Sequence, residues 1–501
     1  MGNEKKEIVP KERVRVLVDR APNSEGDYIL YWMTGARRTT WNYALDRALE
    51  LASELGKPLL VLEAIRLDYR WASDRFHRFV LQGMAENQRR FSAHQVAYYP
   101  FVETQVGEGK GLLRALADSA CVVVTDDAPV FFLPALLRGA VSRLRTRLEA
   151  VDSNGLLPMR EAPKAFARAY DFRRFLQKSL GPWLSQSPCE DALSRLPTRP
   201  LVSLPAACTK RWPPATSALL EAGPLALGRL PLEHSVGPVK YAGGSTTAEQ
   251  RLEGFLNAGF GHYAEGRNRL SSGDSSGLSG YLHFGHISAH EIFRKLAQRE
   301  AWSPDMLGEC TKGKREGWWG MGENSEAFLD QLVTWRELGF NNAVLGANSS
   351  SYSSIPEWAR VSLELHSGDA RPYRYDLATL EQAGTHDDLW NAAQEQLRQQ
   401  GTIHNYLRML WGKKILHWSR SPEEAFEIMV ELNNKYAMDG RDPNSDSGIL
   451  WTLGKFDRAW GPERPVFGKV RYMTSENTRK KLGVGPYIAE WLGPRLDSLL
   501  P

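Results

Sequence analysis

Three tryptophans in the C-terminal part of the chain have a spacing that suits electron transfer. Trp390, Trp411 and Trp418 lie in segments with helical patterns, and Trp411 and Trp418 are seven residues apart. On a helix this spacing puts both side chains on one face, about 10.5 Å apart at about 1.5 Å rise per residue. Indoles at such distances can relay an electron between the surface and a buried cofactor. Tryptophans at helical spacing are more often core side chains, so the pattern alone leaves both interpretations open.

Two polar segments could hold such a cofactor. One is a loop rich in Asn, Asp and Arg that contains Asp439, Arg441 and Asp442. The other is a run of Ser and Gly residues just ahead of an apolar helix: Ser275, Ser276, Gly277, Leu278 and Ser279. Hydroxyls, backbone amides and the helix dipole together favour a phosphate at this place. The same residue types also make ordinary helix caps.

The composition bounds the class of protein. The 501 residues are 42% hydrophobic and 24% charged with a net charge of +4, which permits a local basic groove without requiring one. No apolar run reaches membrane-spanning length and the N-terminus has no secretory pattern, so we expect a cytoplasmic protein with no membrane partner. A monomer is the default expectation, because no sequence feature reports the oligomeric state. The four cysteines form neither a CxxC pair nor a Cys/His cluster, so no metal site is expected.

Alternating strand and helix patterns predict an α/β domain over residues 1–150. A helix begins at a Thr40 cap and ends at Gly56, and GEGKG (Gly107–Gly111) lacks phosphate-loop spacing and is interpreted as a plain turn. This order predicts a doubly wound, Rossmann-like domain. The predicted strands are Arg13–Asp19, Tyr28–Met33, Pro58–Ile65, Tyr98–Glu103 and Cys121–Asp127, and the further helices are Asp74–Ala93 and Gly111–Asp118.

The rest of the chain divides into a connector and a helical domain. Residues 151–245 include a proline-rich stretch with few long periodic segments, which predicts an extended connector. Residues 246–501 are predicted to be all-helical. Helix starts are expected at Thr247 with Gln250, at Thr385 with Asp388, and at Ser421, which precedes Pro422.

Six motifs in a fixed order resemble the photolyase/cryptochrome family. They lie between Tyr263 and Met473 and read YAEGRN…SSGLSGYLHFGHIS, FLDQLVTWREL, THDDLWNAAQ, YLRMLWGKKILHW, LNNKYAMDGRDPN and VFGKVRYM. The stretch Tyr31–Leu45 (YWMTGARRTTWNYAL) resembles the family's N-terminal signature. Within the family, the chain is most similar to the class II cyclobutane-pyrimidine-dimer DNA photolyases. The resemblance implies a flavoprotein lyase that uses blue light to repair UV-damaged DNA.

The resemblance also implies a cofactor and its binding residues. FAD would lie in a U shape inside the helical domain, and reduced flavin excited by light would pass an electron to a pyrimidine dimer, which splits and returns it. By position, Tyr263 and Ser275 to Ser279 correspond to residues around the phosphates, and the loop with Asp439, Arg441 and Asp442 lines the cofactor. An antenna chromophore, either a deazaflavin or a folate, is compatible with the N-terminal domain.

Asn433 corresponds to the Asn that faces the redox-active edge of the flavin in class II enzymes. Its amide can donate or accept a hydrogen bond without carrying charge. Without the resemblance, an Asn near a helix C-terminus would be interpreted as a cap.

The tryptophans acquire roles in the same way. The resemblance puts Trp411 nearest the flavin, Trp390 in the middle and Trp418 at the surface. Trp335 and Trp451 correspond to aromatic walls around a flipped lesion, and stacking on indole offsets the cost of extruding it. Arg458 belongs to a series of basic residues from Lys455 to Lys481 that could bind phosphates or form a solvated surface.

Four departures from the family pattern bear on function. Gln331 occupies a position where the family has a carboxylate, and an amide supplies neither a proton nor a compensating charge to a dimer. Phe456 stands where the family commonly has His, in a loop one residue shorter, and Trp41 replaces an acidic residue. The insertion Gly313–Ser325 has no counterpart. The departures leave open an alternative, a cryptochrome-like FAD photoreceptor that photoreduces but does not repair DNA.

Overall fold

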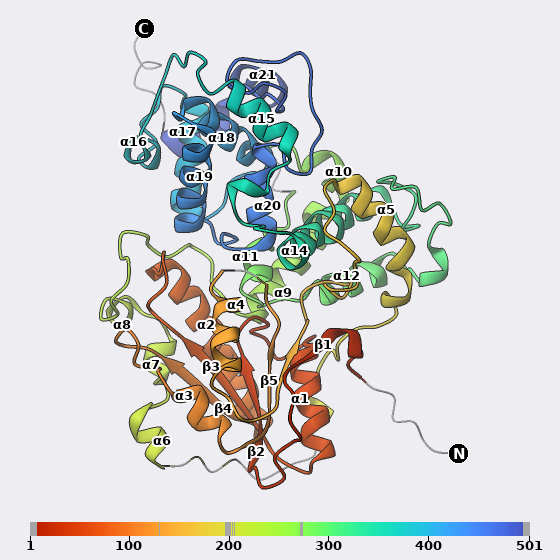
Figure 1. Cartoon of the computed structure of the whole chain (residues 1–501), viewed down its shortest axis with the longest axis vertical. Helices are drawn as coiled ribbons and strands as arrows, with labels where there is room; N and C mark the ends of the chain where they lie inside the picture. The colour runs from red at the N-terminus through yellow and green to blue at the C-terminus, as the bar shows by residue number, and fades with distance from the viewer. Residues whose placement is uncertain are drawn as a thin grey trace. The chain divides into compact units, whose positions relative to one another are not determined.

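The computed structural model describes residues 8–129, 131–195, 202, 204, 206–270 and 274–493. The chain forms two compact units, each of which is described by itself (Figure 1). Unit 1 comprises Met1–Glu161, Leu180–Gln250 and Gly280–Pro304, and unit 2 comprises Ala162–Ser179, Arg251–Ser279 and Asp305–Pro501. Among the described residues, no helix is long and apolar enough to cross a membrane.

Unit 1 contains a six-stranded sheet in the order β1-β6-β5-β2-β3-β4. Its neighbouring strands are parallel except β1, which pairs antiparallel with β6. The strands are β1 (Val14–Val18), β2 (Tyr28–Met33), β3 (Leu59–Ile65), β4 (Ala97–Val102), β5 (Ala120–Asp126) and β6 (Leu148–Val151). Each of the five strands predicted from the sequence is confirmed, with ends that differ by a residue at most.

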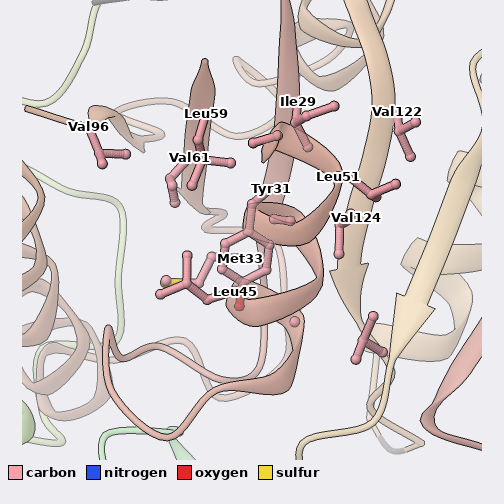
Figure 2. Packing of buried hydrophobic residues seen from close by; sticks show 14 of the residues in the cluster. Ile29, Tyr31, Met33, Leu45, Leu51, Leu59, Val61, Val96, Val122 and Val124 are labelled. Carbon is pink, nitrogen blue, oxygen red and sulfur yellow. The ribbon is translucent and has the colours of Figure 1, made fainter. Parts of the chain in front are cut away.

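Helices cover both faces of this sheet, as a doubly wound fold requires. The residues of β2 alternate: Ile29, Tyr31 and Met33 pack against α1 (Tyr43–Glu54), as Figure 2 shows, whereas their neighbours pack against α3 (Leu112–Ala117) and α4 (Leu133–Val141). Every residue of β2 is buried, which explains its continuous apolar sequence. The predicted fold class is confirmed.

Two helix caps in unit 1 differ from the prediction. Asn42, not Thr40, caps α1, and its side chain accepts hydrogen bonds from the amides of Ala44 and Leu45. The helix α9 (Ser245–Gly254) begins before Thr247, because the carboxylate of Glu86 accepts hydrogen bonds from the backbone amide and the hydroxyl of Thr246. Other predictions are confirmed: α2 spans Asp74–Ala93, the GEGKG segment is a turn, and Gly56 follows α1 with φ +66°. The proline-rich stretch carries three short helices, α6 (Ala206–Arg211), α7 (Ser217–Leu220) and α8 (Pro224–Leu227).

The regular elements in the described part of unit 2 are helices, joined by loops. The helices that matter for the site are α5 (Ala169–Ser179), α10 (Tyr263–Gly266), α13 (Glu323–Leu329), α14 (Arg336–Leu345), α17 (Asp388–Gln400), α18 (Asn405–Trp418), α19 (Pro422–Tyr436) and α20 (Pro443–Thr452). The others are α15 (Glu357–Leu365), α16 (Leu377–Glu381), α21 (Ser475–Lys481) and α22 (Gly485–Leu492). Helix α18 contacts α17, α19 and α20, and so occupies a central position in the bundle (Figure 1).

The starts of α17 and α19 test two cap predictions. Asp387, not Thr385, caps α17, since its carboxylate accepts from the amide of Trp390. The hydroxyl of Thr385 instead donates to Asn391. Ser421 caps α19 with Pro422 in the first turn, so that prediction is confirmed.

Candidate active site

The three tryptophans form one continuous contact series in unit 2. The rings of Trp390 and Trp411 are parallel within 2°, with centroids 6.4 Å apart, and Trp390 meets Trp418 edge to face at 5.5 Å. Trp390 also donates its indole N–H to the carbonyl of Trp411 at 3.0 Å. An ion pair between Lys414 and Asp387, at 3.1 Å, joins α18 to the start of α17. The sequence indicated the spacing on α18, and the structure supplies the middle ring from α17.

Trp418 is not at the surface, which corrects one prediction. Its exposed fraction is 2%, similar to 1% for Trp390 and 3% for Trp411. Tyr375 and His386 cover it, with ring centroids 5.3 Å and 5.5 Å from the indole. The segment before α17 therefore forms the outer layer that the sequence assigned to Trp418.

Gln394 is a site residue that the sequence argument missed. Its side-chain oxygen accepts from the indole N–H of Trp411 at 2.9 Å, and the residue is fully buried. It lies four residues after Trp390 on α17, so one helix face presents both the middle ring and the group that orients the inner ring. That spacing was the signal available in the sequence.

The Ser/Gly segment packs between two helices, next to Tyr263. A side chain on Gly266, at the end of α10, would overlap the carboxylate of Asp274, so α10 lies directly against this segment. On the other side, Arg251 donates to the carbonyl of Ser276 at 3.0 Å, and its guanidinium lies over Gly277. Gly277 has φ +63°, which favours glycine. Ser276 and Gly277 thus adjoin Arg251, and Tyr263 adjoins Arg267.

The donor set fits a phosphate-bearing cofactor such as FAD. Arg267 lies 5.9 Å from the ring of Tyr263, and its buried Nε has no hydrogen-bond partner within the described residues. Leaving a buried donor of a charged group without an acceptor costs roughly 1–3 kcal/mol or more. A phosphate oxygen would provide the missing acceptor. Tyr263 itself is buried in a cluster with Phe255 and Phe328, and burial raises the pKa of its hydroxyl.

The polar loop that follows α19 is internally hydrogen bonded. Asn433 donates its amide N–H to the hydroxyl of Ser445 at 2.8 Å and to Asn434 at 3.1 Å. Arg441, with φ +62°, donates its backbone N–H to the Asn434 side chain at 2.9 Å. Helix α19 continues past Asn433 and ends at an Ala437 cap, so Asn433 is not a capping residue.

Two acidic residues of the loop have structural partners. Asp442 caps α20 by accepting from the amide of Asn444, and Asp439 pairs with Arg408 at 3.0 Å. Both are compatible with a rigid cofactor wall, and neither contact was readable from the sequence.

Helix α18 joins the two candidate cofactor-binding segments. At its start is His404, where burial lowers the pKa of the imidazole and the nearby backbone of Arg267 and Arg269 opposes this. One turn later Arg408 reaches Asp439, and three residues further along is Trp411. A single rigid helix therefore positions the phosphate-side segment, the polar loop and the inner ring of the relay.

Gln331 and Trp335 lie on a π-helical segment, η7 (Asp330–Trp335), between α13 and α14. Such segments are rare and often occur at functional sites. Both side chains are partly exposed, and the side-chain amide of Gln331 makes no hydrogen bond with any of the described residues. Asp330 points elsewhere and pairs with Arg173 of α5 at 2.7 Å, so it does not replace the missing carboxylate.

Helix α14, which follows Trp335, packs very closely against helix α20, which contains Trp451. A side chain on Gly339 would come within 2.8 Å of the carbonyl of Pro443, so only glycine permits this approach. Trp335 and Trp451 are both partly exposed, and no ring contact joins them in the described part of the chain.

A buried lysine lies beneath Trp451. Lys413 is 1% exposed, donates to the carbonyl of Thr452 at 2.5 Å, and lies 5.3 Å from the Trp451 ring centroid. Burial lowers the pKa of Lys413 to about 7, Asp457 opposes this, and Arg471 adds to it. Arg471 lies over Trp451 on another side, at 5.6 Å.

The basic series after Trp451 is only partly a surface. Arg458 is exposed and lies 4.5 Å from the Trp460 ring, as expected for a residue that could contact phosphates. Lys455, in contrast, is buried, donates to Ser354 at 2.8 Å, and burial lowers its pKa to about 8. The expectation that Lys455 forms part of a phosphate-binding rim is therefore wrong.

Comparisons with known proteins agree with this architecture. No family model matches the chain. It is 32% identical over 485 residues to a deoxyribodipyrimidine photo-lyase of Methanothermobacter thermautotrophicus, covering 96% of this chain and 98% of that one. Proteins of the same name from Oryza sativa subsp. japonica (32% over 495 residues, 95% and 90% covered) and Arabidopsis thaliana (30% over 467 residues, 92% and 88%) are also similar.

A crystal structure shares the fold. It is that of a bacterial class III photolyase from Agrobacterium tumefaciens, with a TM-score of 0.63 at 17% identity, covering 93% of this chain and 86% of that one. The identity over nearly the full length of curated relatives decides the assignment. The chain belongs to the photolyase/cryptochrome family, among the deoxyribodipyrimidine photo-lyases.

Proposed function

We propose that this protein is a light-dependent DNA repair flavoprotein of the class II type, which splits cyclobutane pyrimidine dimers in UV-damaged DNA. The observation that carries the proposal is the tryptophan series, whose inner member, Trp411, lies on the helix that also contacts both candidate cofactor segments. Packing alone does not require a parallel indole pair whose inner ring is oriented by a buried amide.

When bound, FAD would supply the light-absorbing group and the transferred electron. Arg251, Arg267 and the amides of Ser275 to Ser279 would hold its phosphates, because they present hydrogen-bond donors and positive charge. Asn433, whose amide N–H is held by Ser445, would present its oxygen to the cofactor edge without adding charge.

The lesion-binding part of the proposal concerns η7 and α20. Trp335 and Trp451 would stack on the two bases of an extruded dimer, with a gain of about 1–3 kcal/mol per stacked base. Gln331 would hydrogen-bond a thymine edge from the same segment as Trp335. Arg458 would contact the phosphates beside the lesion, which positions the DNA without reading its sequence.

The alternative function is a photoreceptor that photoreduces FAD without repairing DNA. The observation that favours it is the absence of a carboxylate at Gln331, since Asp330 is engaged by Arg173. A neutral amide gives less stabilisation to a dimer that has gained an electron than a carboxylic acid that can donate a proton.

One assay separates the two functions. The purified protein, loaded with FAD and reduced chemically, is mixed with thymine-dimer DNA and exposed to blue light, and loss of dimers is measured. Repair at catalytic ratios supports the photolyase proposal. Bound and reducible FAD without any dimer loss would refute it and leave the photoreceptor.

Some finer expectations stay proposals of the same kind. These are the preference for cyclobutane dimers over (6-4) products, an antenna chromophore (a deazaflavin or a folate), a monomeric state and a cytoplasmic location. The division into an α/β domain (residues 1–150), an extended connector (151–245) and a helical FAD-binding domain (246–501) is likewise a proposal.

A further inference from the structure

The insertion Gly313–Ser325 has a defined structure although it has no counterpart in the family pattern. Its two tryptophans, Trp318 and Trp319, are buried against each other with ring centroids 4.8 Å apart. The carbonyl of Trp318 accepts from the amide of Gly308 at 2.8 Å, which closes the loop at its base. The indoles therefore anchor the loop and leave its polar residues outside.

Helix α5 holds the tip of this loop. The Gln177 side chain accepts from the amide of Gly313 at 2.7 Å and donates to the carbonyl of Lys314 at 2.8 Å. Gly313 has φ +81°, and a side chain there would come within 3.1 Å of the Tyr170 ring. The loop thus lies directly on α5, beside a tyrosine that is 52% exposed.

Five exposed cations gather on this loop and helix, and together they are named the basic face. Arg174 and Lys178 lie four residues apart on α5, in line with Tyr170. The loop contributes Lys314 and Arg315, and Lys312 directly precedes it. Within the described residues, none of the five has an ion pair with a carboxylate.

The cations of the basic face repel one another in the absence of a partner. Like charges four residues apart destabilise a helix by a few tenths of a kcal/mol. The nearby carboxylates are Glu316 and Glu323 of the loop, Glu326, which accepts from the amide of Gly317, and Asp171, which is already paired with Arg168 at 2.8 Å. Exposed, unpaired cations around an exposed aromatic ring suit a polyanion.

The basic face is connected to the candidate lesion site within unit 2. Arg173 is a buried residue of α5 and pairs with Asp330 at the start of η7. The segment η7 carries Gln331 and Trp335. The residue before α5, Arg168, forms a β-bridge with Phe456 in the loop after Trp451. Helix α5 therefore contacts η7, and the residue before it contacts the loop that follows α20.

We propose that the basic face binds the phosphate backbone of duplex DNA beside the lesion, and that the insertion extends the DNA contact area. This inference rests on the proposed function, because it takes the DNA partner from it. Exposed cations on a helix and the adjoining loop suit a row of phosphates, and they would raise affinity for damaged and undamaged DNA alike. Tyr170 would pack against a sugar.

The test compares a triple variant, Lys312→Ala/Lys314→Ala/Arg315→Ala, with the FAD-loaded wild type. Binding of an undamaged and a dimer-containing duplex is measured by fluorescence anisotropy between about 50 and 200 mM salt. Each lost phosphate contact lowers the salt slope by about 0.9, so three lower it by up to about 2.7. The affinity advantage of the wild type over the variant should then shrink by up to about 40-fold across that range.

A matched control removes three exposed cations from unit 1, Lys210→Ala/Arg229→Ala/Lys240→Ala. We expect its salt slope to stay close to that of the wild type, and the ratio of damaged to undamaged affinity to be unchanged in both variants. An unchanged slope in the loop variant, or an equal loss in the control, would overturn the proposal. Dimer loss in light, measured at saturating DNA, reports the proposed function separately, and the loop variant should retain it.

Discussion

Trp411→Phe is the substitution that tests the electron relay most directly. It keeps an aromatic ring at the inner position but removes the indole that stacks on Trp390. We expect FAD to stay bound, because no predicted phosphate contact involves Trp411. Photoreduction of oxidised FAD should slow by at least about tenfold, since each 1.4 kcal/mol added to a barrier is a factor of about ten.

The stability cost of Trp411→Phe follows from two contacts. The indole N–H no longer donates to Gln394, which leaves a fully buried amide oxygen without a donor, at a cost of about 1–3 kcal/mol. The smaller ring leaves a void of roughly 40 Å³, which at about 24 cal/mol per Å³ adds about 1 kcal/mol. The free energy of unfolding should therefore fall by about 2–4 kcal/mol, as measured by urea denaturation.

The assay follows flavin absorbance under blue light with an external reductant, and then dimer loss after chemical reduction. The variant should fail in the first step and repair at the wild-type rate in the second. Trp183→Phe, at a buried tryptophan of unit 1, is the control for a lost indole and should photoreduce normally. A wild-type photoreduction rate in Trp411→Phe would refute the relay.

Three further predictions concern the lesion side. Burial lowers the pKa of Lys413 from 10.5 to about 7, so protonating this lysine destabilises the folded state at pH values below the unfolded pKa. Relative to Lys413→Met, the free energy of unfolding of the wild type, measured in urea, should rise by up to about 5 kcal/mol as the pH increases from about 7 to 10. A difference in unfolding free energy that stays constant with pH would contradict this. Gln331→Glu should increase the quantum yield of repair without changing photoreduction; equal yields would show that the amide suffices. Arg173→Met should lower the free energy of unfolding by about 3–5 kcal/mol, because it leaves Asp330 buried and unpaired, whereas the double variant with Asp330→Leu should recover most of the loss.

The α/β unit could be predicted from the sequence because its signals are local. Continuous apolar runs such as Tyr28–Met33 have no alternative to a buried parallel strand, and their ends agree within a residue. Caps were less predictable where several small polar residues adjoin. Asn42 rather than Thr40, and Asp387 rather than Thr385, take the extended conformation that a cap requires, and tertiary contacts decide between them.

The site residues show the same division. The spacing of Trp411 and Trp418 was visible, but the burial of Trp418 depends on Tyr375 and His386, whose approach no periodicity encodes. Lys455 illustrates the opposite error, because a basic residue in a basic series is expected at the surface. The wrong predictions for Trp418 and Lys455 both depend on which distant segment of the chain covers the side chain. Tertiary packing decides this, and local sequence patterns do not encode it.

Helix α18 has a consequence for cofactor exchange. Because His404, Arg408 and Trp411 follow one another along a single helix, a shift of that helix along its axis would move the inner tryptophan of the relay and the proposed cofactor-binding segments together. A flavin analogue with a longer or shorter tail could not be accommodated by loosening one end alone. Under the proposed function, the chain would couple ligand length to electron supply, and analogues that bind well should divide into those that photoreduce normally and those that hardly do.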